Sequence, residues 1–415
     1  MSEAGRRELD ESEIRLLIQF MSEIGAAMNG AGDATTFIRR SLQRIGQAYG
    51  LRNLGVFVVP TLLLLRYGDD RSTFVDLSSQ IPTDLRLDQI AALYELVDEA
   101  ESARVRPVEG MTRLRVILGR PTRFTGYVRV FALTLITAGI IFLLQPSWQE
   151  LVLSLALAIV VGLMKEAAGR WPPVWPLVPA AAGLAAGSTA FLIINEGLDC
   201  RPLQVLIPPL ATFLPGAALT VSMIELSNGD IVAGGSRLAY GTMRLFLLVF
   251  GLILAAQWTG LPDTPDTADV LPLSRYLPIL GLLAFTVGIY LHFSAPKGSF
   301  PWLLLVVAAA WLGQQVGSLF LGGYPGGFVG GMVMIVVARL IQDRPGAPPL
   351  IVCFTPAFWL LVPGAIGLEG LARIVHDSPQ SGIDDVLAMF VTMISIALGV
   401  LVGLMISGSS RALEP

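Results

Sequence analysis

A repeat inside the apolar part of the chain constrains the fold most. In each copy a proline precedes a Pro-Gly-Ala triplet by seven residues: Pro208 precedes Pro215-Gly216-Ala217, and Pro356 precedes Pro363-Gly364-Ala365. The two copies lie 148 residues apart. Because proline removes a backbone donor and glycine permits unwinding, each copy predicts a broken helix. Discontinuous helices at matching positions of two halves point to the binding site of a transporter.

Ten apolar segments after residue 123 extend the repeat to the whole second part of the chain. Most contain about 17 to 24 residues, which suits a hydrocarbon core of about 30 Å. A shift of 148 residues places the first five on the second five, and it matches Gly183 with Gly331 and Gly251 with Gly399. We predict helices at 126–144, 148–164, 174–194, 203–226, 238–258, 273–293, 300–321, 324–341, 350–372 and 386–407.

The two membrane repeats are expected at residues 123–260 and 261–415, with five helices in each. Five is an odd number, so the second repeat should run opposite to the first. Such inverted repeats underlie alternating access in several transporter folds. The predicted fold class is therefore a polytopic α-helical membrane protein with broken helices.

The charged residues mark a separate domain at the start of the chain. Mean hydropathy is +0.67 and 14% of the residues are charged, which excludes an ordinary soluble enzyme. The first 123 residues nevertheless hold 16 of the 28 Lys+Arg and 17 of the 32 Asp+Glu. We predict a small cytoplasmic α/β domain over residues 1–122. Its strands are expected at 54–59, 62–66 and 73–77, and Asp33 is expected to cap the second helix.

Several classes of function are disfavoured by what the sequence lacks. Two cysteines and two histidines, the latter 84 residues apart, predict no disulfide framework, no metal site and no cofactor. A net charge of −4 gives no basic footprint for nucleic acid. Residues 11–118 contain no arrangement of a nucleophile with a base, so we expect no enzymatic activity. The charged start of the chain does not resemble a signal peptide.

Basic residues near the ends of the segments predict the orientation. If the first domain is cytoplasmic, eleven arginines and lysines flank the inner ends, and only Arg201, Arg275 and Arg373 flank the outer ends. The positive-inside rule then places both termini in the cytoplasm. We expect a multi-pass protein of the bacterial cytoplasmic membrane.

The predicted breaks define a candidate binding site. Pro215 lies about 12 residues into its segment, so the break is about 18 Å deep, near the midplane. A half-helix that begins there directs free N–H groups and the positive end of its dipole at the centre, which suits a carboxylate. The alternative is that the prolines only kink helices for packing. The candidate substrate-binding residues are Pro208, Thr212, Pro215, Gly216, Arg244, Pro356, Pro363 and Gly364.

Two acidic residues in the spans are candidates for proton coupling. Ionisable groups inside membrane segments are functional candidates by default. Glu225 lies near the inner end of the fourth segment, and Glu369 lies six residues after Pro363. We expect Glu225, or alternatively Glu369, to take and release a proton. The bland alternative for each is a solvated or snorkelling charge.

The motifs around the first break resemble the signature of the threonine/serine exporter family. They are Leu214-Pro215-Gly216, Glu225-Leu226, Gly229-Asp230, Gly234 and Arg237-Leu238, and in the N-terminal region Gly25, Met28, Ala31-Gly32 and Thr35. The second half, with Val362-Pro363-Gly364, resembles the carboxy-terminal domain of that family. The resemblance spans about residues 13–407. It marks Asp230 and Arg237 as family-motif positions, whereas the Glu225 position is commonly aspartate in the family.

The resemblance implies a ten-helix exporter of threonine and serine that is driven by the proton motive force. Related two-component members are associated with succinate export, so a dicarboxylate exporter is an alternative. A membrane sensor with a ligand-binding cytoplasmic domain is an alternative of another class, and a passive channel is a third. The expected partners are a small-molecule substrate, protons and the lipid bilayer. Glycine-rich faces such as Gly326-Gly327 are compatible with a homo-oligomer.

Overall fold

The computed structural model describes residues 10–51, 53–68, 73–78, 85–262, 271, 275–322, 325–342, 344, 346–361 and 379–407. The chain forms two compact units. The N-terminal unit combines Met1–Pro121 with Glu225–Ser236, and the helical unit combines Thr122–Ile224 with Arg237–Pro415. A short segment from the middle of the chain therefore belongs with the N-terminal unit.

The N-terminal unit contains a three-stranded antiparallel sheet of order β1-β2-β3. The strands are β1 (Leu54–Val59), β2 (Leu62–Gly68) and β3 (Thr73–Ser78), close to the predicted ranges. Side chains alternate between the two faces of a strand. Val58, Leu63 and Leu65 are accordingly buried on one face, whereas Phe57 and Leu77 of the other face are exposed.

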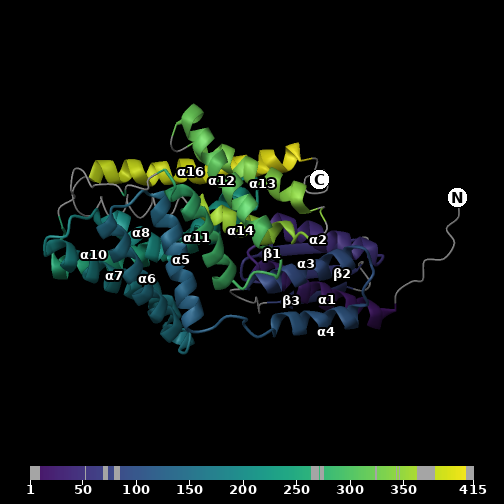
Figure 1. The fold of residues 1–415 in the computed structure, drawn as a ribbon. Helices are drawn as coiled ribbons and strands as arrows, with labels where there is room; N and C mark the ends of the chain where they lie inside the picture. Colours follow the sequence, from purple (N-terminus) through teal and green to yellow (C-terminus); the bar gives the residue numbers. More distant parts are fainter. Residues whose placement is uncertain are drawn as a thin grey trace. The chain divides into compact units, whose positions relative to one another are not determined.

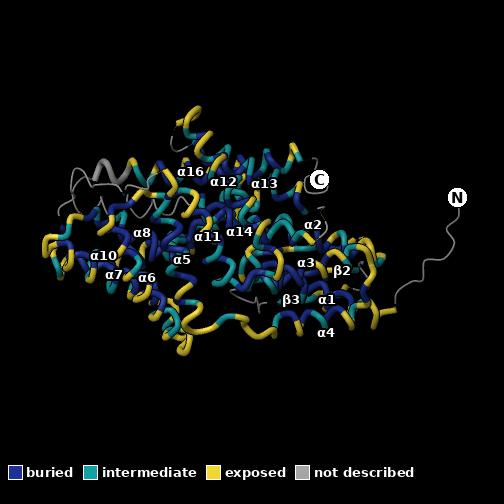
Figure 2. The backbone as a smooth tube through the Cα atoms, in the orientation of Figure 1, coloured by how far each residue is buried: buried dark blue, intermediate teal, exposed yellow. Residues whose placement is uncertain are grey.

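Among the described residues, the first part of this unit also contains α1 (Glu11–Gly30), α2 (Thr35–Ala48), α3 (Leu87–Glu101) and α4 (Pro107–Leu118). Helix α1 contacts β2 and β3, and α2 contacts β1 (Figure 1). Apolar residues at helical spacing, among them Met21, Ile38 and Leu42, are fully buried between these helices and the sheet. Figure 2 shows the burial along each segment.

The expected cap of α2 is wrong by one residue. The N-cap is Ala34, whose own side chain makes no capping hydrogen bond. Asp33 instead accepts a hydrogen bond from the phenol of Tyr94 on α3. A buried hydroxyl needs an acceptor, and the carboxylate of Asp33 supplies one to Tyr94. Burial, followed by the charge of Asp33, raises the pKa of Tyr94 well above its usual value.

The helical unit is built from apolar helices that overlap all ten predicted segments. They are α5 (Tyr127–Leu143), α6 (Trp148–Ala168), η1 (Pro172–Leu177), α7 (Val178–Asn195), α8 (Pro202–Leu210), η2 (Ala211–Phe213), α9 (Gly216–Ser227), α10 (Ile231–Thr259), α11 (Leu277–His292), α12 (Phe300–Leu321), α13 (Gly326–Gln342), α14 (Leu350–Leu360) and α16 (Pro379–Ile406). The last residues of α9 and the first residues of α10 lie in Glu225–Ser236, which belongs to the N-terminal unit.

Length and composition identify the membrane-spanning candidates among the described residues. Five helical stretches are long and apolar enough to cross a membrane, and the bent pair α8–η2 and α9 makes a sixth. The remaining apolar helices, α5, α11, α13 and α14, are shorter than 18 residues as described. The protein is a mostly helical, multi-pass membrane protein.

Glycines that correspond at the 148-residue offset make corresponding contacts. A Cβ atom on Gly251 of α10 would lie 2.0 Å from the carbonyl oxygen of Ala180 on α7. A Cβ atom on Gly399 of α16 would lie 2.1 Å from the carbonyl oxygen of Phe328 on α13. Gly251 and Gly399 are 148 residues apart in sequence, and so are Ala180 and Phe328. The crossings α7–α10 and α13–α16 therefore have the same close backbone approach in the two halves.

One further contact occurs at both crossings, but the glycine lies on α7 in the first half and on α16 in the second half. A Cβ atom on Gly187 would lie 2.8 Å from the Cβ atom of Ala255. At the offset of 148 these two positions are Ile335 and Gly403, and a Cβ atom on Gly403 would lie 2.1 Å from Ile335 Cγ2. One partner at each crossing must be glycine, and either helix can supply it. The inverted orientation of the second half stays a prediction.

Candidate functional site

The predicted break in the first half lies at Pro215-Gly216. The axis bends by 64° between Pro202–Phe213 and Gly216–Ser227. Leu214 is extended, with ψ 125°, and the carbonyl of Pro215 accepts the first bond of α9 from the amide of Leu219 at 2.9 Å. Prolines 208, 209 and 215 supply no amide hydrogen, so helical hydrogen bonding fails across this stretch.

The start of α9 has the chemistry that favours an anion. The first amides of a helix have no partner inside that helix, so those of Gly216, Ala217 and Ala218 point out of its end. The helix dipole adds partial positive charge there. On the other side of the break, the buried hydroxyl of Thr137 on α5 donates to the carbonyl of Pro208 at 3.4 Å. This hydrogen bond from α5 helps to hold the end of α8.

Lys165, one of the eleven basic residues that the sequence analysis counted at the inner ends, reaches this break. The ammonium of Lys165, on α6, donates to Thr212 Oγ1 at 3.1 Å. It also lies 5.2 Å from the centre of the Phe213 ring, within the range of a cation–π interaction. Thr212 was a predicted substrate-binding residue, and the structure places a positive charge beside it.

The other predicted site residues are placed as follows. Pro356 is buried inside α14. The guanidinium of Arg244, on α10, lies 5.9 Å from the centre of the Tyr240 ring, and Arg237 is partly buried one turn before Tyr240. Pro363, Gly364 and Glu369 lie outside the described residues, so the second break remains a prediction.

The turn between α9 and α10 carries the acidic motif residues. Gly229 adopts a positive φ of 82°, and the amide of Asp230 donates to the carbonyl of Glu225 at 2.9 Å. This is the usual way for a helix to end at a glycine. Asp230 then begins α10, because its carbonyl accepts from the amide of Gly234. The Gly-Asp pair of the motif thus ends one helix and starts the next.

Both acidic side chains of this turn contact the first turn of α2 within the N-terminal unit. Glu225 is fully buried, and its Oε1 accepts from the amide of Thr35 at 3.0 Å. The hydroxyl of Thr35 donates to Asp230 Oδ2 at 3.0 Å, and Arg39 Nη2 lies 2.6 Å from Asp230 Oδ1. A helix N-terminus favours negative charge, so two carboxylates stabilise the start of α2. We call these four residues the α2 clasp.

The sequence analysis had quoted Thr35 and Asp230 in the same family resemblance without relating them. They are 195 residues apart in sequence. No periodicity or spacing links positions at that distance. Their shared presence in one motif set was the only signal that could have suggested contact.

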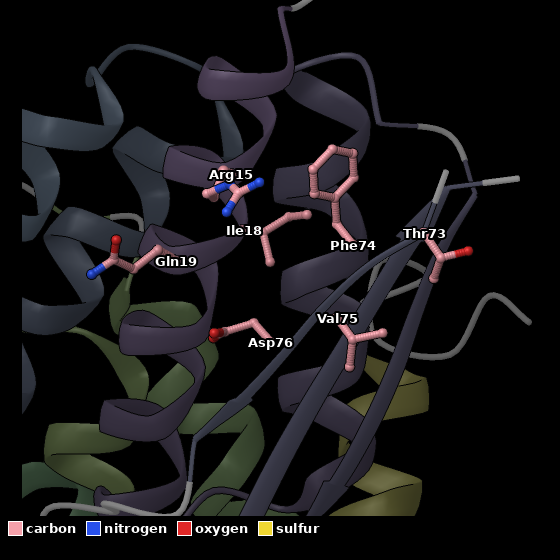
Figure 3. A pocket seen from close by; sticks show the side chains of 7 residues that line it. All are labelled: Arg15, Ile18, Gln19, Thr73, Phe74, Val75 and Asp76. Atoms are coloured by element: carbon pink, nitrogen blue, oxygen red, sulfur yellow. The ribbon is translucent and has the colours of Figure 1, made fainter. Parts of the chain in front are cut away.

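The N-terminal unit also has a hollow of about 490 Å³ between α1 and β3 (Figure 3). Arg15 and Gln19 line it from α1, and Phe74 and Asp76 line it from β3. The guanidinium of Arg15 lies 5.9 Å from the centre of the Phe74 ring. The hollow offers both charges and an aromatic ring, which suits a small zwitterion. Among the described residues no cluster of three His, Cys, Asp or Glu forms a metal site.

Comparison with known proteins identifies the family of this multi-pass membrane protein. The family described as "Putative threonine/serine exporter" (ThrE) matches residues 19–258. The chain belongs to this threonine/serine exporter family. That match includes the break, the acidic turn and the first turn of α2.

Two bacterial relatives align over nearly the whole chain. A "Threonine/serine exporter" of Corynebacterium glutamicum is 21% identical over 95% of this chain and 83% of its own length. A "Probable threonine/serine exporter" of Mycobacterium tuberculosis is 22% identical over 96% and 79%. Two Schizosaccharomyces pombe proteins are 24% and 25% identical over shorter regions, and the chain spans only 28% and 20% of their length. No solved structure matches the chain.

Proposed function

We propose that the protein is a secondary active exporter of small amino acids, with threonine and serine as substrates. The observation that carries this proposal is the break at Pro215-Gly216. It presents a helix N-terminus inside an apolar helix pair, where a substrate carboxylate would find amide donors and partial positive charge. The family to which the chain belongs and the names of the two bacterial relatives support amino acids as the substrate class.

Transport would proceed by alternating access between two repeats of five helices, in a bacterial cytoplasmic membrane with both termini inside. Helix α9 would contribute one half-helix, and the predicted break at Pro363-Gly364 would contribute the other. The equivalent crossings α7–α10 and α13–α16 support a duplicated architecture. Rocking of one repeat against the other would expose the midplane site to each side in turn.

The proton motive force would drive export through a carboxylate. Glu225 lies nine residues after Gly216, about 13 Å along α9. Its carboxylate faces the positive end of α2 through Thr35. Protonation would remove the charge that this helix end stabilises, so proton uptake would loosen the contact of Glu225 with α2. Glu369 is the alternative coupling residue.

Efflux from preloaded proteoliposomes tests the proposal. Labelled threonine, serine and succinate are loaded separately, and their loss is followed with and without an imposed proton gradient. Gradient-accelerated loss of threonine or serine, abolished by Glu225→Gln or Glu369→Gln, is expected. Accelerated loss of succinate alone would assign a dicarboxylate exporter. Flux that a protonophore changes only through the membrane potential would assign a passive channel.

The hollow beside Arg15 favours a second candidate, a membrane sensor whose N-terminal unit binds a small metabolite. Calorimetry of the full-length protein with threonine separates this role from transport. A sensor would show no flux, and its binding would disappear in the double variant R15Q/D76N. An exporter would keep both flux and midplane binding in that variant.

A further inference from the structure

Two candidate membrane spans of the helical unit meet at a short connection. Trp148–Ala168 and Pro172–Asn195 are both long and apolar enough to cross a membrane, and Gly169, Arg170 and Trp171 join them. Because each span takes the chain from one side of the hydrocarbon core to the other, the connection lies at a membrane surface. Arg170 is one of the eleven basic residues whose positions predict that this surface is the cytoplasmic one.

A mostly apolar hollow of about 490 Å³ lies beside this connection. Its walls come from the end of α6, from η1 and from the start of α7, and they include Met164, Leu177 and Ala181. Leu177 and Trp171 are exposed, so the hollow opens on the surface of the helical unit. On a protein that crosses a membrane, lipid acyl chains cover exposed apolar surface of this kind.

Arg170 carries the charge in the lining of the hollow. Glu166 lies four residues before it, the spacing at which an acidic and a basic side chain pair on a helix. Glu166 instead pairs with Arg129 of α5, where N and O are 3.1 Å apart. Within the described part of the chain, the side chain of Arg170 has no ion pair. Arg170 is also exposed, so its guanidinium is accessible to an anion outside the protein.

An anionic phospholipid has the two parts that this site requires. An acyl chain in the hollow removes the apolar walls from water, and a phosphate accepts charge-assisted hydrogen bonds from a guanidinium. Free phosphate would satisfy Arg170 but would leave the apolar walls uncovered. Trp171 and Trp175 flank the hollow on its exposed side, and tryptophan is enriched at the depth of the headgroups.

We propose that this hollow binds an acyl chain of one anionic phospholipid, and that the guanidinium of Arg170 donates hydrogen bonds to its phosphate. Basic sites between membrane helices recognise headgroups in this way. The assignment goes beyond the proposed function, because it depends on the two spans and on Arg170 and is independent of the transported substrate.

Photocrosslinking of the full-length protein in detergent tests the headgroup contact. The probes are phosphatidylglycerol and phosphatidylcholine with the same diazirine-labelled acyl chain, and mass spectrometry of peptides locates the crosslinks. In wild type, phosphatidylglycerol should label residues 164–181 more strongly than phosphatidylcholine. Well below saturation, Arg170→Gln should lower labelling of this segment by phosphatidylglycerol about 5-fold, the effect of one basic residue at an anionic headgroup. Labelling by phosphatidylcholine should stay within about 2-fold of wild type.

A matched control separates this contact from the general attraction of a basic surface. Lys297 is an exposed basic residue between α11 and α12 that does not line the hollow. Lys297→Gln should leave the labelling of residues 164–181 unchanged. Equal losses in K297Q and R170Q, or unchanged labelling in R170Q, would overturn the assignment of Arg170.

A second variant tests the apolar walls. Ala181 is exposed and lines the hollow from α7, so Ala181→Phe should fill the hollow without disturbing the core. Most of the labelling by both lipids should be lost in A181F. The headgroup without acyl chains, glycerophosphoglycerol, should not compete with phosphatidylglycerol. Full labelling in A181F, or effective competition by glycerophosphoglycerol, would refute a site for an acyl chain.

Efflux of threonine from proteoliposomes distinguishes failure of this assignment from failure of the proposed function. Gradient-driven efflux in a protein that fails the lipid tests refutes the lipid site alone. Labelling that depends on Arg170 and Ala181 in a protein without flux supports the lipid site and counts against the proposed function.

Discussion

Replacing Asp230 with asparagine is expected to loosen the first turn of α2, because Asp230 is the residue of the α2 clasp with two charge-assisted contacts. Its carboxylate lies 2.6 Å from Arg39 Nη2 and accepts from the hydroxyl of Thr35 at 3.0 Å. The Asp230 side chain is only 14% exposed, whereas the Arg39 side chain is 34% exposed. Water is therefore largely excluded from the Asp230 carboxylate, whereas the Arg39 guanidinium is partly solvated.

The magnitude follows from this intermediate burial. Exposed ion pairs contribute about 0.2–1 kcal/mol, and hydrogen bonds to charged groups contribute about 1.5–3 kcal/mol. Asparagine keeps one carbonyl oxygen for Thr35 and loses the charge that attracts Arg39. We expect D230N to lower the free energy of opening of the first turn of α2 by about 1–2 kcal/mol, which is a 5- to 30-fold increase in the open fraction.

Hydrogen exchange measured by mass spectrometry on the full-length protein reports this opening directly. Peptides that cover Thr35–Arg39 should exchange about 5- to 30-fold faster in D230N. The control is Glu101→Gln, which disrupts the Arg44–Glu101 pair of the same unit, where N and O are 2.8 Å apart and the side chains are 33% and 21% exposed. In E101Q the exchange of the first turn should not change.

A double-mutant cycle with Arg39→Gln isolates the pair itself. R39Q and D230N should be non-additive, since either substitution alone removes the ion pair. Fully additive effects, or equal acceleration at Thr35–Arg39 in D230N and E101Q, would refute the reasoning. Either result would mean that the clasp is not what holds the start of α2.

Three further predictions concern packing and ionisation. Gly251→Ala should lower the melting temperature, with a cost of about 1–3 kcal/mol in the free energy of unfolding, because the new Cβ would lie 2.0 Å from the carbonyl oxygen of Ala180. Gly235→Ala on the same helix should leave the melting temperature unchanged, because its Cβ would have nothing within 4 Å. Equal melting temperatures of the two variants would contradict the close crossing. Burial raises the pKa of Tyr94, so the stability that its neutral phenol contributes is fully present below about pH 10 and is lost as the pH rises above the pKa of tyrosine in the unfolded chain. Alkaline titration followed by phenolate absorbance should show this loss of stability, and Y94F should reduce the loss. Ionisation of Tyr94 at the pH of free tyrosine, without unfolding, would contradict this prediction. Burial, with the nearby charge of Glu150, raises the pKa of the Cys200 thiol to about 11. Maleimide should therefore not label Cys200 at pH 7.5 until the protein is denatured. Rapid labelling of Cys200 in the native protein would contradict this prediction.

The first break could be predicted from the sequence because its cause is local. Pro215 lacks an amide hydrogen and Gly216 tolerates a new helix start, and both properties act whatever surrounds them. The sequence also indicated that the two crossings would be equivalent, because Gly251 and Gly399 are 148 residues apart, as the repeat requires. A repeat in sequence requires similar packing when small residues set the helix separation.

The features that sequence analysis missed depend on side chains from distant segments. Asp33 has the character of a helix cap, but the buried phenol of Tyr94 competes for it. Lys165 resembles an ordinary basic residue at the end of a helix until the position of Thr212 shows where its ammonium lies. The α2 clasp joins Thr35 to Asp230 across the chain, and no local pattern encodes such a contact.

The most direct test of the proposed binding site is a cryo-EM structure of the full-length protein with threonine bound. We predict density for the ligand at the break, with its carboxylate within hydrogen-bonding distance of the first amides of α9. The second break, at Pro363-Gly364, should approach the same ligand from the other half of the protein. Threonine bound elsewhere, for example in the hollow beside Arg15, or a break that faces lipid, would contradict the proposed site.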